Sequence, residues 1–135
     1  MKEMQLLALA KQAREQAYAP YSGVTVGAAL ETLAGKVYLG CNIENAAYGP
    51  TNCAERTAFF KAVSEGERQF RAIAVVGGKD GAPEGFFPPC GVCRQVMREF
   101  CAGDFLIYLQ GPDGTVKTMT LAELLPQSFG PENVR

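Results

Sequence analysis

The chain has 135 residues, 47% of them hydrophobic, which suffices for one enzyme domain over residues 1–135 and leaves no room for a second. Its 13 Lys and Arg and 14 Asp and Glu give a formal net charge of −1, which argues against nucleic acid as a partner and favours a small, nearly neutral ligand. Residues 1–7 lack the apolar core of a signal peptide and no stretch approaches the length of a membrane span, so we expect a cytoplasmic protein without membrane contact.

The first predicted elements are a helix and two strands. Apolar residues recur every three or four positions over residues 2–17, which predicts an amphipathic helix that covers a sheet and ends before Pro20. Two strands are predicted over residues 24–30 and 36–41. Because the turn between them is short, we expect these two strands to pair antiparallel.

The middle of the chain predicts two helices on either side of a buried strand. The first helix covers residues 53–63, with Asn52 as its N-cap, and the strand covers residues 71–77. A loop that contains Gly and Pro leads from this strand to the second helix, which begins at Cys90. This order allows a strand, helix, strand crossover on each side of the cysteine-bearing helices.

The last third of the chain predicts a hairpin and a short helix. Strands are predicted over residues 104–109 and 115–119, and the tight turn at residues 111–114 requires them to pair antiparallel. Thr120 is expected to cap a helix over residues 122–125. The predicted fold is therefore an α/β protein: a three-layer α/β/α sandwich around a mixed five-stranded sheet, with the two cysteine-bearing helices side by side on one face.

Three cysteines form a candidate metal site. Cys90 and Cys93 are three residues apart directly after Pro89, so on a helix they lie on one face, where the helix N-terminus stabilises thiolates. Because the chain contains no histidine, further ligands must be cysteines or carboxylates, and Cys53, at the start of the other helix, is the best candidate. Three thiolates leave one tetrahedral position for water, the arrangement typical of a catalytic zinc site.

Two charged residues follow Cys53 directly in the first turn of its helix. Glu55 would lie beside the metal, where it could exchange protons with bound water; by itself it could equally be a carboxylate that the helix dipole favours. Arg56 could donate hydrogen bonds to a ligand sulfur and offset the negative charge of the thiolates, and the alternative is a solvated surface arginine.

The pattern Cys53-Ala54-Glu55, followed at a distance by Pro89-Cys90 and Cys93, resembles the zinc-dependent cytidine deaminase family. Four further segments also resemble that family, so the resemblance spans nearly the whole chain: residues 19–22, 26–30, 40–48 and 123–126. It implies one Zn2+ per chain on three cysteines, with Glu55 as a catalytic proton shuttle. The implied reaction is the hydrolytic deamination of cytidine and deoxycytidine to uridine and deoxyuridine with release of ammonia, in pyrimidine salvage.

The resemblance also implies contacts with a nucleoside. Asn42 and Glu44 are two residues apart, so in extended chain their side chains point to one side and could hold a diol. By resemblance they bind the ribose hydroxyls, whereas composition alone would favour a polar turn. Ala54 should contribute its backbone to recognition of the base. A site built around a sugar should reject free cytosine, because buried polar groups would be left without partners.

A homotetramer is the assembly that the resemblance implies, with active sites completed by neighbouring subunits. Aromatic residues at Tyr48 and Phe129 should reach the neighbouring sites. The alternative for both is ordinary packing within one chain.

One position departs from the family pattern. Where the family commonly has Phe shortly after Tyr-Ser, packed against the pyrimidine, this chain has Val24, which cannot stack. We expect Val24 to pack on the base and Val24→Phe to lower KM for cytidine several-fold with little change in kcat. Phe86 or Phe87 could supply the missing aromatic ring instead, although a hydrophobic anchor for their loop is the simpler interpretation.

Other functions remain open from the sequence. A deaminase of a cytosine-nucleoside antibiotic would share the metal motif without needing the sugar-binding pair. A non-enzymatic zinc-binding module, a closed zinc site with a fourth protein ligand, and a protein without metal are further alternatives. The two remaining cysteines, Cys41 and Cys101, are expected to be buried thiols.

Overall fold

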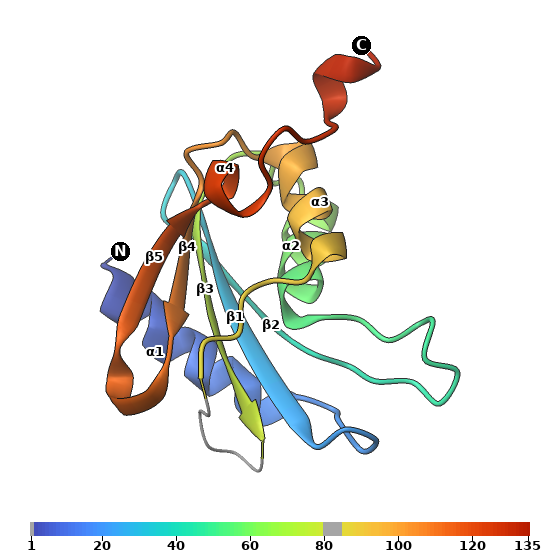
Figure 1. Ribbon diagram of the computed structural model, residues 1–135, viewed down its shortest axis with the longest axis vertical. Coiled ribbons are helices and arrows are strands. Elements are labelled where there is room, and N and C mark those ends of the chain that lie inside the picture. Colours follow the sequence, from blue (N-terminus) through green and yellow to red (C-terminus); the bar gives the residue numbers. More distant parts are fainter. Residues whose placement is uncertain (1, 80–84) are drawn as a thin grey trace.

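The computed structural model describes residues 2–79 and 85–135, which form a five-stranded sheet with helices on both faces (Figure 1). The strands are β1 (Val24–Thr32), β2 (Val37–Cys41), β3 (Phe70–Lys79), β4 (Leu106–Gln110) and β5 (Val116–Thr120). The helices are α1 (Glu3–Ala13), α2 (Ala54–Ser64), α3 (Gly91–Phe100) and α4 (Leu121–Leu124), with 3-10 turns η1 (Arg14–Gln16), η2 (Pro112–Gly114) and η3 (Pro131–Asn133). Within the described residues, none of these helices combines the length and apolar character needed to cross a membrane.

The sheet is mixed, as predicted, with the strand order β2-β1-β3-β4-β5. β1 pairs antiparallel with both β2 and β3, β3 pairs parallel with β4, and β4 pairs antiparallel with β5. Both predicted hairpins are therefore confirmed. The parallel pair of β3 and β4 is joined through α3, and α2 connects β2 to β3 across β1, since parallel strands need a crossover connection.

Alternate residues of the central strands face two separate cores, because successive side chains of a strand point to opposite faces. Leu30 of β1 belongs to the core that contains Phe59 of α2 and Met97 of α3. Its neighbour Ala29 faces the other core, together with Leu6 of α1. All five side chains are fully buried, which confirms the predicted three-layer arrangement with α2 and α3 on one face.

α2 lies directly on the backbone of β2 at Gly40. A Cβ atom at Gly40 would lie only 2.4 Å from the carbonyl oxygen of Ala54 and 2.6 Å from the backbone nitrogen of Ala58. Any side chain there would push the first turn of α2 away from the sheet. The glycine therefore sets how deeply the N-terminal end of α2 lies in the molecule.

The predicted N-cap of the first cysteine-bearing helix is wrong by one residue. Cys53, with extended backbone, is the N-cap of α2. Asn52 instead pairs through its backbone with Ile43, and its side-chain Nδ2 donates a hydrogen bond to Thr57 Oγ1 at 3.1 Å. The amide of Asn52 therefore packs along the side of the first turn and does not cap it. Thr120 caps α4 as predicted, accepting from the backbone N–H of Glu123.

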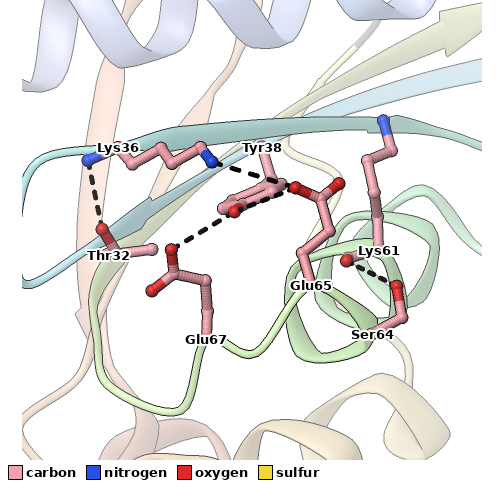
Figure 2. A network of polar contacts seen from close by, with 7 residues as sticks. All are labelled: Thr32, Lys36, Tyr38, Lys61, Ser64, Glu65 and Glu67. Carbon is pink, nitrogen blue, oxygen red and sulfur yellow. Dashed lines mark hydrogen bonds and ion pairs between the residues drawn. The ribbon is translucent and has the colours of Figure 1, made fainter.

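The other end of α2 is tied to the sheet by the polar network of Figure 2. The hydroxyl of the buried Tyr38, on β2, donates to carboxylate oxygens of Glu67 at 3.2 Å and of Glu65 at 3.4 Å. Lys36 lies 3.8 Å from the same Glu65 carboxylate, and its ammonium group is 5.0 Å from the centroid of the Tyr38 ring. These contacts hold the end of the helix close to strand β2.

Candidate metal centre and active site

The three predicted metal cysteines meet where α2 and α3 begin. β2 and β3 both run antiparallel to β1, so their carboxyl ends lie at one edge of the sheet, and α2 and α3 follow these two strands (Figure 1). Cys53 is the N-cap of α2, Cys90 is the N-cap of α3, and Cys93 lies in the first turn of α3. Their Sγ atoms all lie within 4.8 Å of one another. Residues 37 positions apart in the sequence are thus brought together at two helix N-termini.

The spacing of the sulfurs fits a zinc ion. Zinc binds thiolate sulfur at about 2.3 Å in a tetrahedron, which places two ligand sulfurs about 3.8 Å apart. Cys53 Sγ and Cys90 Sγ are 3.7 Å apart. No further Cys, Asp or Glu side chain from residues 2–79 and 85–135 joins this cluster, and the chain has no histidine. The cluster therefore suits a three-thiolate zinc site with one open position.

Arg56 donates hydrogen bonds to two of the three sulfurs. Its Nη2 lies 3.2 Å from Cys53 Sγ and its Nε 3.4 Å from Cys93 Sγ. The hydrogen bond from the Cys93 thiol, helped by those from Arg56 and Cys90, lowers the pKa of Cys53 to about 5, although burial acts in the opposite direction. A thiolate is therefore favoured at Cys53 without an ion, whereas the pKa of Cys93 lies above its usual value because its thiol donates to Cys53.

Glu55 lies almost completely buried beside this cluster. It comes from the first turn of α2, is only 4% exposed, and lines a cavity of about 180 Å³ together with Cys53 and Cys90. Burial raises the pKa of its carboxyl group to about 7, and the nearby Cys53 adds to this increase. A carboxyl group with this pKa can both accept and release a proton near neutral pH.

The cavity next to the cysteines is also lined by Asn42 and Ala54, which were both predicted to contact substrate. Its described lining residues are Val26, Asn42, Thr51, Asn52, Cys53, Ala54, Glu55, Phe87, Pro88 and Cys90. The buried Asn42 accepts a hydrogen bond from Val26 N and donates one to Val24 O, each at 2.8 Å. Because an amide has two donor hydrogens and two acceptor lone pairs, Asn42 keeps one of each for a ligand. β1 thereby fixes the orientation of this side chain.

Glu44 lines a second, adjoining hollow of about 360 Å³. Its carboxylate accepts hydrogen bonds from the backbone of Tyr21 at 3.0 Å and of Ser22 at 3.1 Å, and also from the Ser22 hydroxyl. The hydrogen bond from the Ser22 hydroxyl is the main reason that the pKa of Glu44 lies below its usual value. Thr51 lines both hollows, so they meet at this residue.

Besides Glu44, three other residues that were predicted to contact substrate do not line the cavity beside the cysteines in a single chain. Val24 is half-buried but is not among the described residues that line the cavity; Val26, two residues further on the same strand face, takes that place. Tyr48 lines the second hollow and is 72% exposed. Phe129 is 62% exposed in the C-terminal segment, where its carbonyl accepts a hydrogen bond from Gln95 of α3. Their predicted contacts with substrate stay predictions.

Four lining residues were not predicted to line the cavity: Val26, Thr51, Asn52 and Pro88. Val26 could have been found, because strand alternation places it on the same face as Val24. Thr51 carries no signal in the sequence, since it lies in an irregular segment between β2 and α2.

The two cysteines outside the cluster, Cys41 and Cys101, are both half-buried. Burial raises the pKa of each thiol, to about 12 for Cys101.

Known proteins resemble this chain along most of its length. The family model for the cytidine and deoxycytidylate deaminase zinc-binding region matches residues 1–109. The cytidine deaminase of Sporosarcina psychrophila is 54% identical over 129 residues, which cover 96% of this chain and 92% of that protein. The cytidine deaminase of Halalkalibacterium halodurans is 52% identical over 134 residues, which cover 99% of this chain and 98% of that protein.

Solved structures agree with the sequence relatives. The crystal structure of cytidine deaminase from Burkholderia pseudomallei superimposes with a TM-score of 0.88 at 50% identity, covering 96% of this chain and 100% of that one. The enzyme from Mycobacterium tuberculosis gives a TM-score of 0.82 at 38% identity, covering 97% and 99%. The expected cytidine deaminase-like fold is thus confirmed. On this similarity of sequence and fold along nearly its whole length, the chain belongs to the cytidine and deoxycytidylate deaminase zinc-binding family.

Proposed function

We propose that this protein is a zinc-dependent cytidine deaminase that hydrolyses cytidine and deoxycytidine to uridine and deoxyuridine with release of ammonia. The observation that carries this proposal is the buried Glu55 in a cavity walled by two of the three zinc-binding cysteines. The named relatives favour this reaction over an antibiotic-nucleoside deaminase or a zinc module without activity. The near-neutral charge of the chain suits an uncharged nucleoside.

The chemistry divides between the metal and the side chains of the cavity. Cys53, Cys90 and Cys93 would hold the zinc ion, which when bound would act as a Lewis acid and lower the pKa of a bound water from about 15.7 toward about 7. Glu55 carries both protons of the attacking water in turn: the first goes to N3 of the pyrimidine as the oxygen bonds to C4, and the second goes from the new C4 hydroxyl to the amino group, so that the C4–N bond breaks, ammonia leaves and a C4 carbonyl remains. The buried position of Glu55 in this cavity keeps its carboxyl group beside the reacting atoms and away from bulk water.

The two adjoining hollows suit the two halves of a nucleoside. The cavity with Glu55 takes the pyrimidine, where the backbone of Ala54 at the start of α2 contacts the base. Asn42 and Glu44 contact the sugar hydroxyls from either side of Thr51. A carboxylate offers about four acceptor positions, and three are used by Tyr21 and Ser22, so Glu44 keeps one for a hydroxyl. The hydrogen bonds from Tyr21 and Ser22 hold it in place.

Assembly as a homotetramer is part of the same proposal. Tyr48 and Phe129 are large aromatic side chains that are mostly exposed in one chain. Tyr48 also has a backbone φ of 58°, a conformation that is uncommon for residues other than Gly, in a turn where its N–H donates to Asn45 O at 2.9 Å and its carbonyl accepts from Thr51 N at 2.8 Å. In a tetramer both rings would be buried against neighbouring active sites. A monomer that is fully active at the concentration used for light scattering would contradict this arrangement.

The function is tested by following the loss of cytidine absorbance on addition of the zinc-loaded protein. Deoxycytidine, free cytosine and CMP serve as comparisons. We expect turnover of both nucleosides and little turnover of cytosine, which lacks the sugar hydroxyls that would use the remaining hydrogen-bonding positions of Asn42 and Glu44. CMP should react slowly, since the described residues that line the two hollows include no Lys or Arg for a phosphate. Absence of cytidine turnover would overturn the proposal. Cytoplasmic location and a role in pyrimidine salvage follow as expectations.

A further inference from the structure

Phe87 lies in the wall of the cavity that holds Glu55, in contact with the central strands. Gly77 of β3 and Val26 of β1 are directly paired across the sheet. A Cβ atom on Gly77 would lie 2.9 Å from Cγ of Phe87 and 3.0 Å from Cγ2 of Val26. The ring of Phe87 therefore rests on the bare backbone of Gly77 and beside Val26. Phe87 and Val26 both line the cavity.

Its neighbour Phe86 points elsewhere. A Cβ atom on Gly111 would lie 2.7 Å from Cζ of Phe86, and the Lys117 ammonium group lies 4.9 Å from the centroid of the same ring. Phe86 is not among the described residues that line the cavity. This residue anchors the segment to the region between β4 and β5, the structural role that the sequence suggested for either phenylalanine. Anchoring Phe86 leaves Phe87 free to face the cavity.

We infer that Phe87 provides the aromatic surface against the pyrimidine ring of the substrate, the contact that Val24 cannot make. This inference rests on the proposed function. Of the described residues that line the cavity, Phe87 alone is aromatic, and the same cavity holds Glu55 and Ala54. The Phe87 ring is therefore the aromatic part of the wall of the cavity that a planar base enters to reach Glu55. Aromatic rings in such a position attract another π-system beyond their buried area.

Gly77 is a second element of this contact. Its missing side chain lets the Phe87 ring lie back against the sheet, which leaves room for the base. A methyl group at this position would be too close to both Phe87 and Val26, so the ring would have to move toward the cavity. The width of the base site is thus set by a backbone position of β3 that has no contact with substrate itself.

The test compares Phe87→Leu with the matched variant Phe86→Leu. Both remove one ring from the same segment, but only one ring lies in the cavity. With cytidine, Phe87→Leu should raise KM roughly 2- to 10-fold and leave kcat within about twofold, the signature of lost uniform binding. Phe87→Tyr, which keeps the ring, should retain the KM of the unaltered protein. Phe86→Leu should leave KM unchanged. Zinc content and thermal unfolding are measured for each variant.

The inference is overturned if Phe87→Leu leaves KM unchanged, or if both Leu variants raise KM equally, which would indicate loss of the loop anchor alone. If Phe87→Leu does not retain zinc, Phe87→Met, which also removes the ring but can fill an irregular gap with its flexible side chain, is judged by the same criterion. Val24→Phe is a further comparison: a several-fold lower KM would show that the stacking position is empty and would also overturn the inference. Failure of the proposed function is distinct, since the unaltered protein would then not deaminate cytidine.

Finally, Gly77→Ala separates a role of the ring from general damage to β3. In the presence of Phe87 it should raise KM, because the displaced ring narrows the base site. In a Phe87→Leu background the same substitution should have less effect on KM, since the smaller side chain leaves space for the methyl group. Equal effects in both backgrounds would contradict a contact between Gly77 and the substrate-facing ring.

Discussion

The two ends of α2 place glutamates in opposite surroundings. At the N-terminal end, Glu55 is 4% exposed and shares a cavity with Cys53. At the C-terminal end, the Glu65 side chain is 51% exposed and interacts with Lys36 and Tyr38. Glu65 keeps contact with solvent and has favourable partners, whereas burial and the nearby Cys53 disfavour the charge of Glu55 more than Arg56 favours it. The N-terminal end of α2 thus contributes to the candidate active site, and the C-terminal end attaches the helix to the sheet.

The largest effect should come from removing the sulfur at the start of α2. In Cys53→Ser the hydroxyl can still cap the helix, because Ser is a favoured N-cap, but it cannot replace a thiolate ligand. We expect loss of zinc and of essentially all turnover in a folded protein, measured by metal analysis and the cytidine assay. Cys101→Ser, which changes a half-buried thiol outside the cluster, should keep both. Full zinc content in Cys53→Ser would refute the assigned ligand set.

Replacing the buried carboxylate should abolish proton transfer while the metal stays bound. For Glu55→Gln we expect kcat to fall by about 10²- to 10⁴-fold, the range typical of general acid-base catalysis, with one zinc retained per chain. Glu65→Gln, at the exposed end of the same helix, should leave kcat unchanged. Turnover of Glu55→Gln at the level of the unaltered protein would exclude Glu55 as the proton shuttle.

The arginines near the two ends of α2 give a third comparison. Arg56 donates to the sulfurs of Cys53 and Cys93, whereas Arg68 donates to the backbone carbonyls of Val63 and Glu67. Loss of hydrogen bonds around a metal ligand typically lowers metal affinity about 10- to 100-fold. Competition with a chelator should show this loss in Arg56→Gln and no loss in Arg68→Gln.

The free energy of unfolding of the zinc-free protein should depend on pH because of Glu55, at the buried N-terminal end of α2. In zinc-free protein the folded-state pKa of Glu55, about 7, lies above its ordinary value of 4.5, so the folded state holds the proton more tightly. This contribution to the free energy of unfolding is complete below pH 4.5 and is lost as the pH rises through 7. At pH 8, Glu55→Gln should therefore be more stable than the unaltered chain, by about 3 kcal/mol, and at pH 4 the two should converge. Denaturant unfolding at both pH values measures the difference.

The smallest effect is expected at the exposed end. Tyr38→Phe removes the hydroxyl that contacts Glu65 and Glu67 but keeps the buried ring. A hydrogen bond of this kind contributes about 1 kcal/mol to the free energy of unfolding. We expect a loss of that size without change in kcat, KM or zinc content. A change in zinc content would mean that the two ends of α2 are coupled.

The metal site could be predicted from the sequence because its signals are local. Cys90 and Cys93 are one helical turn apart, and Glu55 and Arg56 share the first turn of α2 with the preceding Cys53. Strand and helix positions followed from apolar periodicity, and the short turns determined which strands pair antiparallel. These features depend on neighbours within a few residues, which the sequence displays directly.

The walls of the substrate site depend on contacts between distant segments. Nothing near Phe87 in the sequence indicates that Gly77 of β3 lies beneath its ring. Glu44 was predicted to hold a sugar, but its hydrogen bonds to Tyr21 and Ser22 join residues that are 22 to 23 positions away. The position of Asn52 beside the first turn likewise results from pairing with Ile43. Such contacts are determined by tertiary packing, which overrides the local preference of Asn for an N-cap.

Because α2 packs directly on Gly40, the amount of zinc that this protein binds should depend on how closely α2 lies against β2. A methyl group at Gly40 would lie 2.4 Å from the Ala54 carbonyl oxygen, where ordinary contacts begin at 3.4 Å, so the helix would have to retreat. Metal–ligand distances tolerate deviations of only about 0.2 Å. Substitutions that lift α2 from β2 will therefore yield metal-deficient protein, restored by excess zinc, although no altered atom touches a sulfur. Inherited or engineered variants in this strand should be sorted by metal occupancy before they are classed as folding defects.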